Sequence, residues 1–163
     1  EYEFHLLADD QTVNAFALPG GQIFITYALF RQLNEAQLAG VLGHEIGHVI
    51  GRHSAERIAD SNFWKTVSMG ASVGADAGSL VGSIGQNTLL TNGREDELES
   101  DDLGVLFMMQ SDYQPEEMIG VMKILKASAG PDRVPEFQST HPDPDNRIER
   151  IQEAIEKYKE QTG

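Results

Sequence analysis

The sequence contains no cysteine. Its absence excludes disulfide bonds and thiolate metal ligands, so any metal centre in this chain has to be built from His, Asp or Glu. The absence does not indicate a compartment, because a cysteine-free protein tolerates reducing and oxidising surroundings equally well.

Basic residues are also scarce. Lys and Arg number 12 against 26 Asp and Glu, which gives a formal net charge of −14 and a pI of about 4.6. Because phosphates attract basic surfaces, this balance argues against a nucleic-acid partner. It also disfavours tight binding to anionic lipid. We interpret the acidity as a source of solubility rather than as an acidic recognition surface.

Long apolar runs are missing as well. No stretch reaches the roughly 18 uninterrupted apolar residues of a spanning helix, and no signal peptide is visible. The sequence does not exclude peripheral contact with a membrane. The chain begins at Glu1 inside an expected strand, so we expect a mature or trimmed polypeptide. Its 163 residues, 40% of them hydrophobic, fit one domain spanning residues 1–163.

The pattern of the remaining sequence predicts an α+β domain. Residues 2–8 and 22–26 have strand character, and Leu18-Pro19-Gly20-Gly21 suits a type II turn. Together they predict a small, mostly antiparallel sheet, packed on the helix that follows Asn34, a good N-cap. Expected helices cover residues 34–50, 52–67, 95–110, 115–127 and 143–159.

The segment of residues 67–90 differs from the rest of the chain in composition. Residues 67–90 are rich in Gly, Ala and Ser and carry a single charge, Asp76. We expect small-residue helices that pack closely on the domain, in preference to a mobile lid or a membrane-touching hairpin.

The segment His44-Glu45-Ile46-Gly47-His48 is an HExxH motif. Two histidines one turn apart on a helix lie within about 40° of each other, so both rings can reach one zinc ion. Glu45 projects beside them and can take a proton from water bound to the metal. The alternative is a pair of structural histidines, which the placement on a capped helix disfavours.

A third protein ligand is needed, and three residues compete for the role. His53 would lie about 180° from His44 if the helix continued, so we interpret it as a structural polar residue. Glu97 and Asp101 share one face of the helix expected downstream, whereas Glu99 points about 200° away from Glu97. Glu97 is therefore the expected ligand, and Asp101 the acceptor of the outer N–H of a ligand histidine. A solvated acidic helix start is the alternative.

The sequence resembles a family of zinc metallopeptidases that includes the CAAX prenyl peptidases, the HtpX heat-shock proteases and the periplasmic BepA-like proteases. Four motifs in the same order carry the resemblance, over nearly the whole chain. They are residues 14–21 (NAFALPGG), residues 38–53 (LAGVLGHEIGHVIGRH), Glu97 and Asp101 within ELESDDLG, and residues 139–142 (STHP) followed by Arg147.

Two departures from the family are informative. The family usually has Ala before the aspartate of its ExxxD motif, and this chain has Ser100. Residues 67–90 are too polar for the spanning helices of the membrane-bound branches, so the soluble BepA-like branch is the most similar. That branch often carries a C-terminal tetratricopeptide-repeat domain, which is absent from this sequence.

The resemblance implies a gluzincin-type minimal metallopeptidase domain with one Zn²⁺ held by His44, His48 and Glu97. It implies a zinc-dependent endopeptidase acting on proteins or peptides, with a role in the quality control of misfolded envelope proteins. The implied location is periplasmic or otherwise extracytoplasmic, and membrane association stays open.

The resemblance also singles out His141 and Arg147. His141 could steady the oxyanion or bind zinc as a fourth ligand, and four protein ligands would close the site. We hypothesise that His141 is a latch that must leave before water can bind. Arg147 either stabilises charge in the transition state or pairs with a carboxylate, and the sequence does not decide between the two.

The mechanism expected from these residues uses Glu45 as general base and then as proton donor to the leaving amine. We expect the peptide to add a strand to the sheet along an edge formed by Gly21, Gln22, Ile23, Phe24 and Ile25. Two rival functions remain. One is a catalytically idle zinc-binding scaffold or chaperone-like module closed by His141, and the other is a hydrolase that does not act on peptides.

Overall fold

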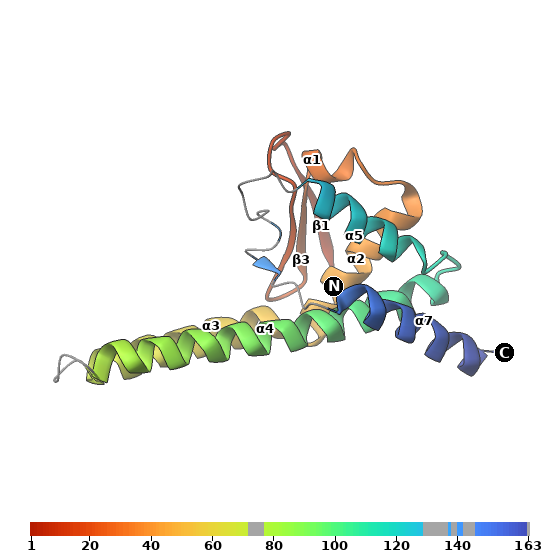
Figure 1. The fold of residues 1–163 in the computed structure, drawn as a ribbon. Helices are drawn as coiled ribbons and strands as arrows, with labels where there is room; N and C mark the ends of the chain where they lie inside the picture. Colours follow the sequence, from red (N-terminus) through yellow and green to blue (C-terminus); the bar gives the residue numbers. More distant parts are fainter. Residues whose placement is uncertain (72–76, 129–136, 138–139, 142–145, 163) are drawn as a thin grey trace.

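The computed structural model describes residues 1–71, 77–128, 137, 140–141 and 146–162. It confirms the α+β class: three strands form one small sheet and the rest of the framework is helical (Figure 1). The strands are β1 (Glu3–Leu7), β2 (Ala15–Leu18) and β3 (Gln22–Thr26). The helices are α1 (Tyr27–Phe30), α2 (Glu35–Ile50), α3 (His53–Ala71), α4 (Ala77–Gln110), α5 (Glu117–Ala127) and α7 (Arg147–Thr162).

The sheet is mixed rather than mostly antiparallel. Its strand order is β1-β3-β2, and β3 pairs with β1 in parallel and with β2 in antiparallel orientation. The turn between β2 and β3 has Gly20 at φ +99°, the left-handed backbone that a type II turn requires at this position. Because β3 is the central strand, hydrogen bonds to neighbours occupy both of its edges. The expectation that residues 21–25 form an open edge is therefore wrong.

Helix α2 begins and ends where the sequence predicts. The side chain of Asn34 accepts a hydrogen bond from the Gln37 backbone, the Gln37 side chain accepts one from the Asn34 backbone, and Gly51 ends the helix. The apolar side of α2 is not its most buried side. Leu42 and Ile46 are only half-buried, whereas the face with the histidines and glycines is buried throughout. This inversion indicates that another element packs tightly against the histidine face.

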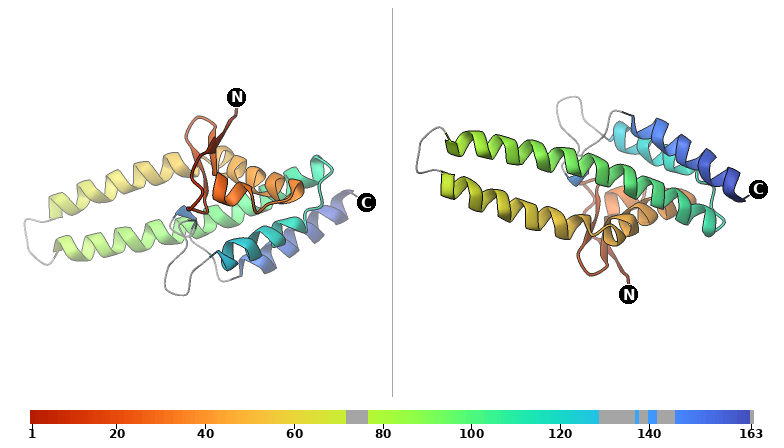
Figure 2. Two further views of the ribbon diagram at one scale, coloured as in Figure 1. Left: turned by 90° about the horizontal axis from the view of Figure 1, so that it is seen from above. Right: turned by 90° about the horizontal axis from the view of Figure 1, so that it is seen from below.

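That element is α4, which runs antiparallel to α3. The two helices leave the body side by side and project far beyond it as an arm (Figures 1 and 2). The helical prediction for residues 67–90 holds for the described part of that segment, but packing on the domain does not, because the outer halves of α3 and α4 lie against each other. Among the described residues, no helix combines the length and the apolar character needed to cross a membrane.

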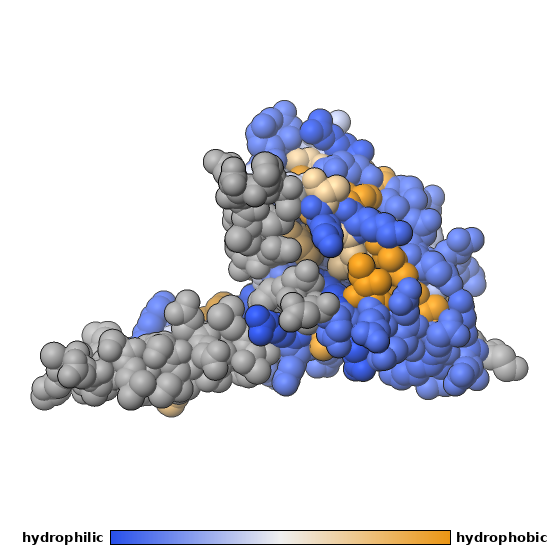
Figure 3. All heavy atoms as spheres, in the orientation of Figure 1, coloured by the Kyte–Doolittle hydropathy of each residue, from blue (hydrophilic) through white to orange (hydrophobic). Residues whose placement is uncertain are grey.

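Two hydrophobic clusters hold the body together. The first packs the sheet and α1 against α2 and α5, and contains Ala15, Ile25, Leu29, Val41, Val121, Leu125 and Phe137. The second joins α4, α5 and α7 through Val105, Met108, Met118, Ile151, Ala154 and Ile155. Figure 3 shows a mostly hydrophilic face, with hydrophobic side chains gathered where α5 meets α7. The two clusters fix α2 and α4 relative to each other, and these helices carry the site.

Candidate metal centre

Glycines bring α2 and α4 into close contact. A Cβ atom added at Gly47 would lie 2.9 Å from the Cα of Ser100, and one at Gly43 would lie 3.3 Å from the Cα of Gly104. A Cβ at Gly104 would in turn lie 3.1 Å from the backbone nitrogen of His44. The absence of side chains at these positions allows the backbones to approach each other, and α4 presents Glu97 to the HExxH face of α2.

The expected ligands meet around one point. The Nε2 atoms of His44 and His48 are 3.1 Å apart, and Glu97 places its carboxylate oxygens 3.3 Å and 3.2 Å from them. Four atoms bound tetrahedrally at about 2.0–2.1 Å from zinc lie about 3.3–3.4 Å from one another. The observed spacing is therefore that of a zinc coordination shell.

His141 supplies a fourth nitrogen. Its Nδ1 lies 3.0 Å from Glu97 and 3.4 Å from the Nε2 of His44, and the ring is buried. Its Nε2 lies 3.1 Å from the carbonyl oxygen of Ala15, which can only accept a hydrogen bond. A neutral His141 therefore carries its proton on Nε2 and directs the lone pair of Nδ1 into the cluster. His44, His48, Glu97 and His141 together form a group whose ligand atoms lie within 4.8 Å of one another.

The chemistry of this group suits a metal cation. The side chain of Glu97 is fully buried, and its Oε2 has ionic neighbours at 3.3 Å but no hydrogen-bond partner among the described residues. Burial would raise the pKa of Glu97, but the charge and hydrogen bonds of the surrounding histidines hold that pKa well below its usual range. An ionised, incompletely paired carboxylate among imidazole nitrogens, with no cysteine in the chain, fits Zn²⁺.

Glu45 lies beside the cluster, where the sequence predicts a general base. It is fully buried, and neither carboxylate oxygen has a hydrogen-bond partner among the described residues. Burial raises the pKa of Glu45, which makes the carboxylate a stronger proton acceptor. Its nearest ionic neighbour is Nε2 of His141, 3.5 Å from Oε1. A buried carboxylate left without donors is costly, and this cost is expected at a position kept for a reacting water.

Asp101 and Arg147 hold His44 in place. Asp101 lies 2.9 Å from Nδ1 of His44, and Arg147 donates two hydrogen bonds to the same carboxylate, at 2.6 Å and 2.8 Å. Arg147 also approaches Glu97 to 3.3 Å and is buried. Asp101 thus stands where the sequence predicted. Of the two roles considered for Arg147, the arrangement favours pairing with carboxylates.

The two histidines of the motif differ in protonation. Burial lowers the pKa of His44, but its hydrogen bonds to Asp101 and Glu97 and their charges outweigh that effect and raise the pKa to about 9. Burial dominates at His48 and lowers its pKa to about 3. In the metal-free chain at neutral pH, His44 is therefore cationic and its Nε2–H points toward Nε2 of His48. Zinc has to replace that Nε2 proton when it binds.

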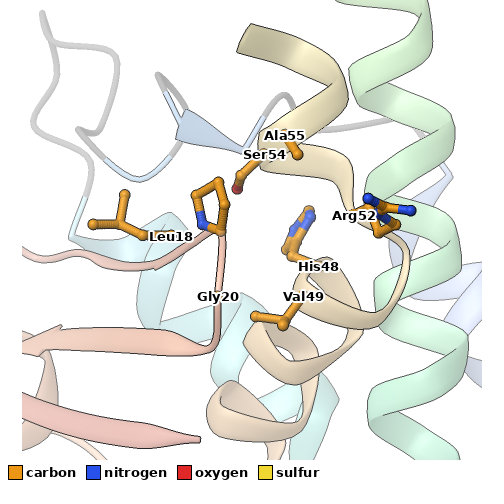
Figure 4. A pocket seen from close by; sticks show the side chains of 8 residues that line it. Leu18, Gly20, His48, Val49, Arg52, Ser54 and Ala55 are labelled. Carbon is orange, nitrogen blue, oxygen red and sulfur yellow. The ribbon is translucent and has the colours of Figure 1, made fainter. Parts of the chain in front are cut away.

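A cleft opens beside the cluster, between β2 and the start of α3. One cavity of about 200 Å³ is lined by Glu45, His48 and His141 together with Phe16, Ala17 and Leu18 of β2. A second, of about 170 Å³, continues past Leu18 and Gly20 to Arg52 (Figure 4). Of the five residues predicted to bind substrate, none lines either cavity. The strand at the cleft is β2, which sequence reasoning missed although residues 14–21 stood among the family motifs.

Sequence reasoning interpreted His53 as a structural polar residue, and the structure places it outside the group of possible ligands, but the contact of His53 with His48 was missed. The ring of His53 is buried, and its Nδ1 lies 3.0 Å from Nδ1 of His48. The argument against it assumed that α2 continues, whereas the helix ends at Gly51 and Arg52 takes a positive φ of 60°. A glycine followed by a new helix at residue 53 is the signal that could have suggested this reversal.

A helix-borne histidine pair, a glutamate from a second helix and a neighbouring base define the site of a zinc metallopeptidase. Comparison with known proteins agrees. The chain matches peptidase family M48 over residues 1–155, and it belongs to that family.

Two groups of relatives are similar over most of this chain. The mitochondrial metalloendopeptidase OMA1 of Schizosaccharomyces pombe is 34% identical over 160 residues, which cover 94% of this chain and 46% of the relative. The beta-barrel assembly-enhancing protease of Escherichia coli K12 is 32% identical over 163 residues, which cover 90% of this chain and 33% of the relative. The chain thus spans a third to a half of the length of these curated relatives.

Proposed function

We propose that this chain is a zinc-dependent endopeptidase that hydrolyses internal peptide bonds of protein substrates. One observation carries the proposal: Glu45, whose oxygens have no hydrogen-bond partner among the described residues, is buried at the edge of the four-residue cluster that fits zinc. A zinc site with a purely structural role has no use for an unpaired buried carboxylate, since such a group only costs stability.

The residues divide the chemistry among them. Zinc, when bound to His44, His48 and Glu97, activates a water molecule and polarises the scissile carbonyl. Glu45 accepts the proton of the attacking water and delivers it to the leaving amine. Its raised pKa suits the first half of this cycle, because a carboxylate whose pKa lies closer to the working pH takes a proton from water more readily. Asp101 keeps the proton of His44 on Nδ1, so that Nε2 faces the metal.

The substrate is expected along β2 rather than β3. The carbonyl oxygens of Ala15 and Ala17 point away from β3, since they accept hydrogen bonds from His141 and from the Ser54 hydroxyl. An extended peptide that enters the cleft would pair with this edge and replace those two bonds. The peptide would then pass the cluster and Glu45, which line the same cavity.

His141 would leave the cluster in the same event. Its ring is oriented by the hydrogen bond from Nε2 to the Ala15 carbonyl, while Nδ1 faces the cluster beside Glu97, so a peptide that takes the Ala15 carbonyl removes the bond that orients the ring. This is the latch expected from the sequence, and it reconciles four protein groups at the centre with hydrolysis, which needs an open position.

The alternative function rests on the same residue. If His141 stays as a permanent fourth ligand, the chain is a zinc-binding scaffold without turnover. The deciding experiment compares wild type with Glu45→Gln, measuring bound zinc and casein hydrolysis. We expect equal zinc in both and the loss of nearly all turnover in the variant. Glu97→Ala should lose the metal as well. Turnover that survives Glu45→Gln would overturn the endopeptidase mechanism, and zinc-loaded wild type without any turnover would favour the scaffold.

Cellular role and location follow from the relatives by analogy. One is named for beta-barrel assembly and another for mitochondria. We propose an extracytoplasmic location and substrates among misfolded envelope proteins. The acidic surface, with a net charge of −14, gives little electrostatic attraction to anionic lipid, so peripheral membrane contact would have to be hydrophobic.

A further inference from the structure

The inference concerns His53, which reaches the metal centre through an abrupt reversal of the chain. Helix α2 ends at Gly51, Arg52 adopts the left-handed conformation at φ 60°, and α3 begins at His53. The reversal folds the imidazole of His53 back over Gly51. A Cβ at Gly51 would lie 2.2 Å from Nε2 of His53, so only glycine leaves room for the ring.

The folded-back ring meets the outer side of a ligand histidine. The Nδ1 atoms of His48 and His53 are 3.0 Å apart, and the two rings stand nearly perpendicular, at 83°. Both side chains are buried, with 5% and 3% of the residue exposed, so water does not separate them. This contact has hydrogen-bond length.

The position of the proton in this contact follows from the metal site. His48 turns Nε2 toward the cluster, and a nitrogen that binds a metal carries no proton. A neutral His48 therefore has its proton on Nδ1 and must donate it outward. His53 has to accept with Nδ1, so its own proton sits on Nε2. That atom faces the carboxylates of Glu99 and Asp96, at 3.6 Å and 3.8 Å.

We propose that His53 is a positioning residue for zinc: it accepts the Nδ1–H of His48 and thereby fixes the ring and tautomer of that ligand. The inference rests on the proposed zinc centre and extends it. Each ligand histidine of α2 then has its own outer acceptor, Asp101 for His44 and His53 for His48. Outer acceptors of this kind typically change metal affinity by about 10–100-fold when removed.

Ser100 offers a competing contact. Its hydroxyl lies 3.3 Å from Nδ1 of His53, and the side chain is fully buried. In the proposed arrangement the lone pair of that nitrogen is used by His48, at the shorter distance of 3.0 Å. Ser100→Ala should therefore leave zinc affinity unchanged, which makes it the control for the acceptor role of His53.

The first test needs no substitution. Nitrogen-15 NMR of the zinc-loaded wild-type chain reports which ring nitrogen of each histidine carries a proton. We expect His48 protonated on Nδ1 and His53 protonated only on Nε2. A proton on Nδ1 of His53 would overturn the proposal, because two N–H groups cannot bond to each other.

The second test compares two side chains of similar size. His53→Asn places an amide oxygen near the original Nδ1, whereas His53→Leu places a methyl group there. Zinc affinity, measured by competition with a chromophoric chelator, should fall about 10–100-fold in the Leu variant and recover to within a few fold in the Asn variant. The absorption spectrum of the Co²⁺-loaded protein should change with Leu and stay close to wild type with Asn.

The outcomes separate this inference from the proposed function. Equal zinc affinity in wild type and His53→Leu, or equal losses in Leu and Asn, would show that His53 only fills space. If the Leu variant does not fold, the Asn variant still decides, since a large loss of affinity with the acceptor restored contradicts the proposal. Failure of Glu45→Gln to abolish turnover would refute the endopeptidase mechanism and leave these metal-binding results standing.

Discussion

Gly47→Ala should dismantle the metal centre without touching a ligand. Gly47 lies on α2 between the two histidines, and an added Cβ would come within 2.9 Å of the Cα and 3.1 Å of the carbonyl oxygen of Ser100. Both obstacles are backbone atoms of α4 and cannot swing aside. The helices would have to separate by several tenths of an ångström, and α4 would carry Glu97 away from the histidines.

Two effects of opposite sign determine the magnitude. Replacing a helical glycine by alanine favours the helix by about 0.8–1.0 kcal/mol. Overpacking a tight contact costs about 1–3 kcal/mol. We expect a net loss of roughly 0–2 kcal/mol in the free energy of unfolding. Zinc sites tolerate displacements of only about 0.2 Å in ligand distance, so zinc affinity should fall by more than stability alone would suggest.

The chain offers two matched controls. Gly43 lies one turn earlier on the same face of α2, where an added Cβ would meet the Cα of Gly104 at 3.3 Å, so Gly43→Ala should be milder. At Gly120 on α5, the obstacle nearest to an added Cβ is the side-chain amide of Gln37, at 2.8 Å, which can move away. Gly120→Ala should be neutral or slightly stabilising.

Urea unfolding of the metal-free proteins and zinc competition would give both quantities for all three variants. The expected order of stability is Gly120→Ala, then Gly43→Ala, then Gly47→Ala, with zinc loss concentrated in the last. If Gly47→Ala is as stable as Gly120→Ala and keeps wild-type zinc affinity, the close helix crossing does not position Glu97 and the reasoning fails.

Three further predictions concern the surroundings of the metal. The pKa of His44 is raised to about 9 in the metal-free chain, so zinc affinity should rise as pH increases from about 6.5 to 9. Over the same pH range, the metal-free protein should lose the stability that protonated His44 gives it. Calorimetry at several pH values would measure zinc affinity and stability, and a flat profile would contradict the assignment. Asp101→Asn leaves Arg147 buried without its main anion, so we expect a loss of about 3–5 kcal/mol in unfolding free energy and weaker zinc binding, and a change below 1 kcal/mol would count against the buried pair. His141→Ala should raise turnover and remove one nitrogen from the zinc shell seen by X-ray absorption; lower turnover on every substrate with an unchanged shell would refute the latch.

Much of the site was readable because it depends on local geometry. The HExxH spacing places two imidazoles on one side of a helix regardless of the rest of the fold, and Asn34 and Gly51 mark the ends of that helix. The four-residue spacing of Glu97 and Asp101 likewise puts both carboxylates on one face of α4. That these two faces meet was inferred from the need for a third metal ligand and supported by the resemblance to a family, since no local rule brings together residues more than fifty positions apart.

The wrong predictions concern places where contacts between residues distant in sequence overrode a local sequence pattern. Residues 22–26 have the composition of a strand, but composition does not say which neighbours a strand acquires, and β1 takes the edge that was expected to be free. The small side chains of residues 67–90 permit close packing, but the composition does not determine which element packs against them. In the structure, α3 and α4 lie against each other. Projecting His53 along an unbroken helix gave the wrong direction, because one residue with positive φ turns the ring back.

The sequence by itself determined the donor atoms of the metal site: a cysteine-free chain can hold zinc only through nitrogen and oxygen, and one helical turn fixes the positions of the two histidines and of Glu45, the proposed base. The tertiary structure alone decided which further groups reach them. Glycine contacts between α2 and α4 bring Glu97 within reach, Arg147 of α7 holds Asp101, and the reversal after Gly51 delivers His53 to His48. The physical reason is that residue spacing sets directions within one helix, whereas the packing of the two hydrophobic clusters sets the distances between helices.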